Sequence, residues 1–507
     1  MEHIGSGPIN PSLLTLQKNH VSTNIWNGGE VTFRAMYNFW QNLPSAPVLE
    51  VIRNTTFGHI IDIGTIEINN HLITALVEKW RPETHTFHLP VGECTVTLED
   101  VTYQLGLPIN GAPVTGIASG NWEMICHNLL GAIPTDKQIM GQRIQMSWLD
   151  STFAVLPPHA DDVVIEQHAR GMIGGFLMPD TSGSRVHLMY LPLLEDLSQT
   201  FQYSWGSAVL ACLYRGICRA ALISHQIEIG GCLHLLQSWA YDRIPMLAPR
   251  VGATSNHTNI HGHATNIIRS MLDRLRIDQF VWTPYRNITY VGPIHDLVRA
   301  RVPLICFALV EWHDADRVMR QFGLQQPIPE DQINLEKQHK MNLRWKNDYN
   351  WPQKHDQWIQ VWNNRENYVV NGFPDNQLLY RYSQYMQWYL QRTRKYISPD
   401  GAYSAGSYNF IKMIRDRCAP TNVFPNPLQS LNDVYHNCNE MMQAFAQLIP
   451  TAFSSTTSQA PPPQQFQMSF APDYQQHYES QTHTDTFPQA YTQTLAPQQQ
   501  QQHPFGF

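Results

Sequence analysis

Three histidines in one polar segment form the arrangement best suited to metal binding in this sequence. His257, His261 and His263 are four and two residues apart, so their imidazoles could converge on zinc in a suitably folded loop. No paired cysteine motif accompanies them, and Asn256 and Gly262 are typical of a polar loop. We interpret them as ordinary loop histidines and predict no metal ligands.

Paired carboxylates occur at Asp161-Asp162 and at Asp314 with Asp316, and they raise the possibility of acid–base chemistry or a transposase-like metal site. Adjacent acids point in different directions, and helix starts are enriched in acids because of the helix dipole. Spacing alone assigns no third acidic ligand. We predict that both pairs are structural.

His85 and His88 lie in a segment that alternates polar with apolar residues. In a strand, that alternation can place the two rings on opposite faces. We expect structural hydrogen bonding for each ring rather than catalysis.

Two enzyme classes need groups that this sequence does not supply. A pyridoxal-phosphate enzyme needs a Schiff-base lysine, but there is no lysine between Lys137 and Lys337, and Lys79 is interpreted as a surface charge on a helix. A two-metal phosphatase needs clustered Asp, His and Asn ligands. No Gly-Asp dipeptide occurs, and Trp122 stands where a Gly-Asn-His-Glu motif would need histidine. We predict no catalytic residue and no cofactor.

Arginines are the candidates for phosphate binding. Arg215 and Arg219 share one helical face, and further positive charge comes from Arg269, Arg274, Arg276, Arg299 and Arg301. We favour pairing of these arginines with acids such as Glu228, Asp273, Asp278 and Asp296. The formal charge is -7, and five acids follow the last basic residue, Arg417, which leaves about -2 for residues 1–417. A nearly neutral body does not predict strong attraction to nucleic acid.

Helical patterns dominate the segments that must position these groups. Apolar residues on one face after Asn69-Asn70 predict a helix that ends before Pro82. Residues 86–90 and 93–96 have the pattern of a small hairpin, and a capping box at 97–100 starts a helix that Gly106 ends.

Further helices are predicted over 205–217 and 233–240. Residues 304–310 fit either a buried strand or part of a helix. The aromatic-rich stretch 351–397 is interpreted as two helices joined around Gly372-Phe373-Pro374. The predicted fold class is mainly α with a small β component (α+β).

Length and composition predict one large domain with a tail. The chain has 507 residues, 43% of them hydrophobic, and no stretch long and apolar enough to span a bilayer. The start of the chain lacks a signal-peptide pattern, and the eight scattered cysteines are expected to be reduced thiols of an intracellular protein. The expected divisions are an N-terminal segment 1–24, a domain 25–417 with core 70–330 and aromatic-rich helical extension 351–417, a C-terminal helix 418–450, and a disordered Gln/Pro-rich tail 451–507.

The run of residues 76–116 closely resembles the signature of the plant mobile domain family, in particular its maintenance-of-meristems group. Blocks at 205–215, 229–240 and 316–323 follow in the family's order, with weaker similarity at 362–365 and 385–389. The signature residues that carry this resemblance are Trp80, Arg81, Pro82, Glu83, Thr84, His85, Phe87, Leu89, Pro90, Leu105, Gly106, Leu107, Pro108, Gly116, Trp205, Gly206, Gly230, Gly231, Gln237, Trp239, Arg320 and Phe322. For these we predict structural or interaction roles.

The resemblance implies a nuclear, non-enzymatic protein of a family shared with transposable elements. Such a protein would act through complexes in meristem maintenance, transposable-element silencing and genome integrity. Its expected partners are other nuclear proteins, among them a long-form serine/threonine phosphatase, with DNA or chromatin as a further option and no membrane. The alternatives are a transposon-derived nucleic-acid-binding module and a divergent phosphatase or transferase. Aromatic residues at Trp358, Trp362, Trp388 and Tyr389 could form a partner surface, although we expect most of them in the core.

Overall fold

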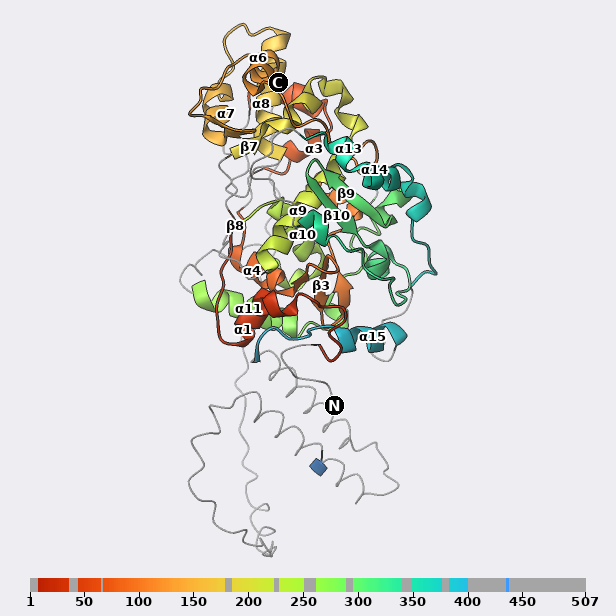
Figure 1. Cartoon of the computed structure of the whole chain (residues 1–507). Helices are drawn as coiled ribbons and strands as arrows, with labels where there is room; N and C mark the ends of the chain where they lie inside the picture. The colour runs from red at the N-terminus through yellow and green to blue at the C-terminus, as the bar shows by residue number, and fades with distance from the viewer. Residues whose placement is uncertain are drawn as a thin grey trace, which may run out of the picture. The chain divides into compact units, whose positions relative to one another are not determined.

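Helices make up about half of the described chain, and the strands form short sheets of two or three strands, which confirms the predicted class (Figure 1). The computed structural model describes residues 8–35, 44–64, 67–177, 185–222, 228–249, 261–288, 295–339, 349–375, 383–399 and 435–436. These residues belong to one compact unit, Met1–Pro450, while a second unit, Thr451–Phe507, contains none of them. The predicted tail, and the predicted helix within 418–450 except Tyr435 and His436, therefore lie outside the described residues.

The described α-helices run in chain order through the domain. They are α1 (Val21–Trp26), α2 (Ala46–Arg53), α3 (Gly58–Ile61), α4 (Asn70–Lys79), α5 (Leu98–Leu105), α6 (Trp122–Leu130), α7 (Met146–Phe153), α8 (Asp162–Leu177), α9 (Trp205–Ala221), α10 (Leu233–Arg243), α11 (His261–Asp273), α12 (Glu336–His339), α13 (Trp351–Lys354), α14 (Asp356–Asn363) and α15 (Gln384–Arg392). Short 3₁₀ helices connect them: η1 (Gln17–Asn19), η2 (Leu188–Leu194), η3 (Leu197–Gln202), η4 (Pro245–Leu247), η5 (Ile277–Gln279), η6 (Asp296–Arg299), η7 (Ala315–Phe322) and η8 (Arg365–Tyr368). No helix among the described residues is long and apolar enough to cross a membrane.

The strands form four small sheets. They are β1 (Arg34–Ala35), β2 (Trp80–Arg81), β3 (Thr86–Leu89), β4 (Gly92–Cys94), β5 (Ile139–Met140), β6 (Arg143–Gln145), β7 (Arg185–His187), β8 (Glu228–Ile229), β9 (Val302–Cys306) and β10 (Leu309–His313). β1 and β8 pair in parallel; β2-β3-β4, β5-β6-β7 and β9-β10 are antiparallel. The predicted hairpin at 86–96 is confirmed by β3 and β4, and the apolar run 304–310 spans the turn of the β9-β10 hairpin.

The ends of α4 and α5 are set by their sequences. The Asn69 side chain accepts hydrogen bonds from the backbone N–H groups of His71 and Leu72, both at 3.1 Å, and α4 ends where Trp80 enters β2. The capping box of Thr97 and Asp100 starts α5, and Gly106 ends it in the left-handed conformation with φ 65°. In the sequence, the β2-β3-β4 sheet therefore lies between two short helices with well-defined ends.

Helix α9 lies at the centre of the core, where it packs against α4, α5, β2 and the β9-β10 hairpin (Figure 1). Its close approach to residues 230–231 requires glycine. A Cβ on Gly216 would lie 2.0 Å from the Gly230 carbonyl oxygen, and a Cβ on Gly231, whose φ is 96°, would lie 2.7 Å from Leu213 Cα. The Gly230-Gly231 pair of the family signature therefore has a packing explanation.

A satellite core is built by α6, α7 and the β5-β6-β7 sheet. Its buried members are Cys126, Leu130, Ile144, Trp148, Leu149, Phe153, Val186, Leu188 and Leu191. Figure 1 shows these elements grouped with α8 at one end of the described chain, where α8 also packs against α2.

The aromatic-rich stretch differs from its prediction of two helices. Two short helices, α13 and α14, meet at His355, a 3₁₀ turn follows, and α15 begins only at Gln384. α13 ends before His355, whose buried ring stacks on Trp351, and α14 begins at Asp356. Trp362 and Tyr389 are buried and Trp358 and Trp388 are partly buried, so these aromatics belong mainly to the core.

Candidate functional site

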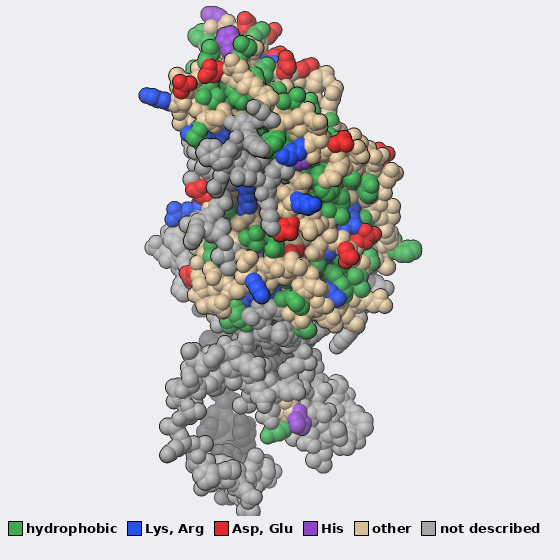
Figure 2. Space-filling model, viewed as in Figure 1, with side chains coloured by type: hydrophobic (Ala, Val, Ile, Leu, Met, Phe, Trp, Pro, Cys, Tyr) green, Lys and Arg blue, Asp and Glu red, His purple; other side chains and the backbone are tan. Residues whose placement is uncertain are grey.

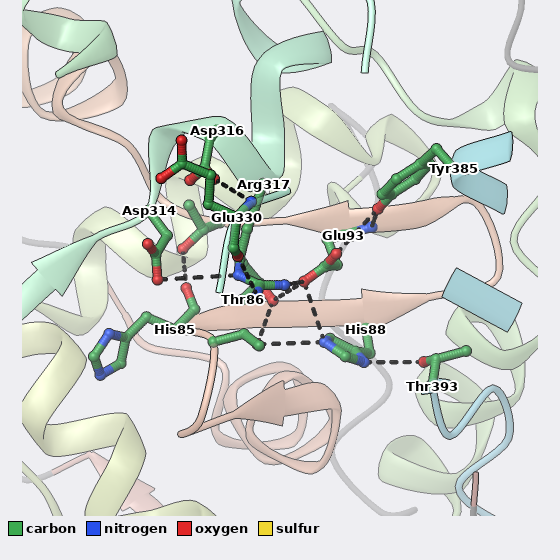
Figure 3. Close-up of polar contacts among 12 residues, drawn as sticks. His85, Thr86, His88, Glu93, Asp314, Asp316, Arg317, Glu330, Tyr385 and Thr393 are labelled. Atoms are coloured by element: carbon green, nitrogen blue, oxygen red, sulfur yellow. Dashed lines mark hydrogen bonds and ion pairs between the residues drawn. The ribbon is translucent and has the colours of Figure 1, made fainter. Parts of the chain in front are cut away.

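The carboxylate of Glu93, on β4, is the centre of a buried polar network (Figure 3). Its Oε1 accepts hydrogen bonds from Arg317 Nη1 at 3.0 Å and from Thr86 Oγ1 at 3.2 Å. The Tyr385 hydroxyl donates to Glu93 Oε2 at 3.2 Å and accepts from the Glu93 backbone N–H at 3.0 Å. Glu93 and Tyr385 are 292 residues apart, so this carboxylate connects α15 to the β3-β4 hairpin, which we call the signature hairpin.

Arg317 extends from η7 to reach Glu93, and acidic groups surround its other side (Figure 3). Its Nε lies 4.0 Å from Asp314 Oδ2, and its Nη2 donates to the Glu330 carbonyl oxygen at 3.3 Å. Arg301 Nε in turn lies 3.0 Å from Asp314 and 3.3 Å from Asp316. Asp314 and Asp316 were predicted to be structural, and in the structure both carboxylates lie beside arginines.

His88 also belongs to this network, whereas His85 does not. His88 Nδ1 lies 3.0 Å from Thr393 Oγ1, and its Nε2 lies 3.3 Å from Thr84 Oγ1 and 3.5 Å from Glu93 Oε1. Burial lowers the pKa of His88 to about 4 despite the nearby carboxylate. Burial alone would raise the pKa of Glu93, but Arg317 and His88 lower it to about 2. The network therefore holds a neutral imidazole and an ionised carboxylate near neutral pH.

We expect His88 to make the fold acid-sensitive. Its pKa of about 4 lies below the ordinary value of 6.5, so the unfolded chain binds a proton that the folded chain excludes between those values. The stabilisation is present above pH 6.5 and is lost as pH falls toward 4, by about 3 kcal/mol in total. Urea unfolding across pH 4–7 should show a smaller acid loss for His88→Gln than for the wild type. The exposed control His127→Gln should follow the wild type, and an equally steep loss in His88→Gln would contradict this origin.

A second polar cluster surrounds Glu311 on β10. His85 Nε2 and His339 Nε2 each lie 3.0 Å from Glu311 Oε2, while Arg215 on α9 binds Oε1. His85 Nδ1 lies 3.1 Å from the Trp312 carbonyl oxygen, which fixes the ring. Figure 3 shows the His85 ring pointing away from the His88 and Glu93 network. Burial alone would lower the pKa of His85, but Cys218 and Glu311 raise it well above its usual range.

Three more buried ion pairs connect α4 and α5 to α10 and α11. Lys79 Nζ lies 2.5 Å from Asp273 Oδ1, and both side chains are fully buried. Arg243 Nη2 lies 2.7 Å from Asp100 Oδ1, again with both side chains fully buried. The third pair is bidentate, from Arg269 to Glu78, at 2.6 and 2.7 Å. The interpretation of Lys79 as a surface charge was therefore wrong: its position at the end of α4 faces α11 rather than solvent.

The remaining polar signature residues also make internal contacts. Glu83 Oε1 accepts from the Leu16 backbone N–H at 2.7 Å, and Gln237 accepts from the Asn69 N–H at 2.7 Å. Arg320 pairs with Asp375 at 3.1 Å and lies over the Trp282 ring. Thr84 and Thr86 hydroxyls are 2.7 Å apart.

The aromatic signature residues form the adjoining core. Trp80, Trp205 and Trp239 are fully buried. Phe87 stacks on Trp239 at 4.9 Å and meets Trp80 edge-on at 4.8 Å. Trp80 Nε1 donates to Cys218 Sγ at 3.2 Å. The signature is thus brought together in space, around the hairpin that joins α4 to α5.

Other candidates have local explanations. The Asp161 side chain accepts from the Val164 N–H at 2.9 Å at the start of α8, and Asn121 caps α6 by accepting from the Met124 N–H at 3.1 Å. The side chains of His257, His261 and His263 lie outside the described residues. Of the seven arginines, Arg276 pairs with Asp278 and Arg299 with Asp296, as predicted. Asp273 pairs with Lys79 instead, and Arg215, Arg269 and Arg301 use acids that the prediction did not name.

Sequence reasoning missed Glu93, Arg317 and Glu311 as centres of networks. Each is a charged residue inside or beside a short apolar strand or a family block, which is the signal that could have indicated a buried partner. The ion pairs of Glu93 with Arg317 and of Glu311 with Arg215 join residues more than 90 positions apart, so no local spacing reveals these pairings.

The described residues form a mainly helical domain in which the aromatic and polar side chains of the run 76–116 meet side chains from later segments inside the protein. A family model described as "Plant mobile domain" matches residues 56–390 of this chain. This chain belongs to the plant mobile domain family.

Curated relatives from Arabidopsis thaliana agree with this assignment. "Serine/threonine-protein phosphatase 7 long form homolog" is 34% identical over 91% of this chain, but the chain spans only 38% of that relative. "Protein MAIN-LIKE 1" is 33% identical over 76% of this chain and 79% of its own length. "Protein MAINTENANCE OF MERISTEMS" is 33% identical, with coverage of 78% and 85%. No solved structure matches this chain.

Proposed function

We propose that this chain is a non-enzymatic nuclear protein that acts through protein complexes in meristem maintenance, transposable-element silencing and genome integrity. The observation that carries the proposal is the inward direction of polar groups in the run 76–116 and in the later blocks 316–323 and 385–389. Glu93, Arg317, His88 and Tyr385 bond to one another in a buried network. Polar residues that are buried and paired in this way stabilise the folded domain. We therefore place the binding function on the surface of the domain.

The names of two relatives support the proposed function. One relative is named for the maintenance of meristems and another for a long form of a serine/threonine phosphatase. A long-form phosphatase is therefore the first partner to test. Nuclear localisation and the silencing role rest on the family resemblance.

The arginine pairing favours a protein partner over nucleic acid. Arg215, Arg269 and Arg301 pair with buried or partly buried carboxylates, which lowers the charge available to phosphates. Figure 2 shows basic and acidic side chains interspersed over the visible face. Binding driven by counterion release would need many unpaired cations on one face.

Recovery from plant nuclei tests the proposal. The full chain, tagged and expressed near its native level, is purified from nuclei after nuclease treatment, and bound proteins are identified by mass spectrometry. We expect a phosphatase or silencing factor in a stable, near-stoichiometric complex. Absence of the chain from nuclei, or partners that disappear with nuclease, would contradict the proposal.

Two exposed aromatics, one at the end of η8 and one in the segment that follows it, are the first positions to alter. Phe373 is 78% and Tyr368 43% exposed, and Gln325 N donates to the Phe373 carbonyl at 2.8 Å, so a fixed backbone presents the Phe373 ring. Tyrosine is among the residues enriched in binding hot spots, and phenylalanine is enriched at interfaces. We expect the double variant Phe373→Ser/Tyr368→Ser to reduce partner recovery by roughly tenfold or more, about 1.4 kcal/mol, with an unchanged unfolding temperature.

The matched control for this surface is Met124→Ser in the satellite core's helix α6, where Met124 is 59% exposed. It should leave both partner recovery and unfolding temperature unchanged. Full partner recovery by the Phe373 and Tyr368 variant would place the partner surface elsewhere.

A further inference from the structure

The cluster of His85, Glu311 and His339 has the composition of a metal site. One ligand atom from each of these residues lies within 4.8 Å of the others. They come from the start of the signature hairpin, from β10 and from the end of α12, so tertiary folding alone assembles them. Two imidazoles and one carboxylate are a ligand set that Zn²⁺ uses when it keeps a fourth position open.

The tautomer of His85 makes this convergence chemically specific. Its Nδ1 lies 3.1 Å from the Trp312 carbonyl oxygen, which can only accept, so Nδ1 carries a hydrogen. Nε2 is then the nitrogen left to bind an ion, close to the Glu311 carboxylate, and a metal ion there would displace the proton that the imidazolium carries. A backbone carbonyl that fixes one ring nitrogen while the other faces the ion is the usual second-shell arrangement of metal-binding histidines.

The contact between His85 and Glu311 brings a ring nitrogen and a carboxylate oxygen as close as two ligands of one ion. His85 Nε2 is buried and lies 3.0 Å from Glu311 Oε2. His339 Nε2 approaches the same oxygen at 3.0 Å.

The backbone of His85 is held in a rare conformation. Its φ is 50°, in the left-handed region, and its carbonyl oxygen accepts from Thr95 Oγ1 at 2.7 Å. A histidine with positive φ costs free energy and commonly marks a site where a side chain must be aimed. The ring is therefore oriented before any ligand arrives.

The charges around the cluster are mixed. Arg215 binds the second carboxylate oxygen of Glu311, and Arg219 lies on the same helix one turn later. The Cys218 thiol interacts with His85. The His339 side chain is 27% exposed, which gives an ion and a water ligand access to the cluster.

We propose that His85, Glu311 and His339 bind one divalent transition-metal ion of the Zn²⁺ class. This site ties α12 to the β9-β10 hairpin and the signature hairpin. It is independent of the proposed function, since it would hold whichever partner the surface binds.

Zinc binding by the full chain tests the site. The protein is produced without a polyhistidine tag, stripped with a chelator and titrated with Zn²⁺ against a chromophoric chelator. His339→Ala is the test variant because His339 is partly exposed, and exposed His127→Ala is its matched control. A third variant replaces His257, His261 and His263 with alanine.

We expect one tightly bound zinc per chain in the wild type, the His127→Ala variant and the triple variant. His339→Ala should bind it at least roughly 100-fold more weakly, because loss of a ligand exceeds the effect of losing a second-shell partner. Co²⁺ in the wild type should give the visible absorption of a four-coordinate site. Absence of stoichiometric zinc in the wild type, or undiminished binding by His339→Ala, would overturn the proposal.

Discussion

Replacing Arg317 with alanine is expected to destabilise the protein by about 3–5 kcal/mol, because it leaves the Glu93 carboxylate buried without its cation. Both side chains are at most 1% exposed and lie 3.0 Å apart. A loss of this size is a large fraction of the 5–15 kcal/mol that holds a typical domain folded. Chemical denaturation of the full chain, followed by tryptophan fluorescence, would measure it.

The control is Arg276→Ala, which removes a solvent-exposed ion pair to Asp278 and should cause no measurable change. The double variant Glu93→Gln/Arg317→Met should be more stable than Arg317→Ala, because no uncompensated charge remains. A stability of Arg317→Ala equal to that of the wild type would show that the network contributes little to the fold.

Lys79→Met is the second substitution with a large expected effect. It removes the cation 2.5 Å from the fully buried Asp273 carboxylate, so we again expect a loss of about 3–5 kcal/mol. Lys79 Nζ also donates to the Lys395 carbonyl oxygen at 2.9 Å, and the Ile397 N–H donates to Asp273 at 3.2 Å. Amide hydrogen exchange in residues 393–399 should therefore accelerate more than elsewhere.

The exposed lysine Lys137 provides the control, since Lys137→Met changes the same charge at the surface. It should match the wild type in both unfolding and exchange. If Lys79→Met behaved like Lys137→Met, then Lys79 would be the surface charge that its sequence position first indicated.

Local features of the fold were predictable because they depend on residues close in the chain. Asn69, the box of Thr97 and Asp100, and Gly106 act within one helical turn, and all were identified correctly. The β3-β4 hairpin was predictable from alternation over a few residues. The 351–397 stretch was not, because aromatic density indicates burial but gives no period that separates one long helix from several short ones.

The polar networks depend on contacts that no local pattern encodes. Glu93 meets Arg317 and Tyr385 across more than 200 residues, and Lys79 meets Asp273 across 194. A lysine at the end of an amphipathic helix is usually exposed, so tertiary packing overrode a reasonable local expectation. The convergence of His85, Glu311 and His339 was missed for the same reason, while the histidines with suggestive spacing lie in a segment with undescribed side chains.

The central claim is that the buried network around Glu93 stabilises the fold and does no chemistry. The double variant Glu93→Gln/Arg317→Met tests this claim most directly. The variant is expressed in plant nuclei, and its nuclease-resistant partners are compared with those of the wild type by quantitative mass spectrometry. The account predicts the same partners in proportion to the amount of folded protein. A variant that folds as stably as the wild type but loses those partners would contradict it, because the network would then have a role beyond holding the fold.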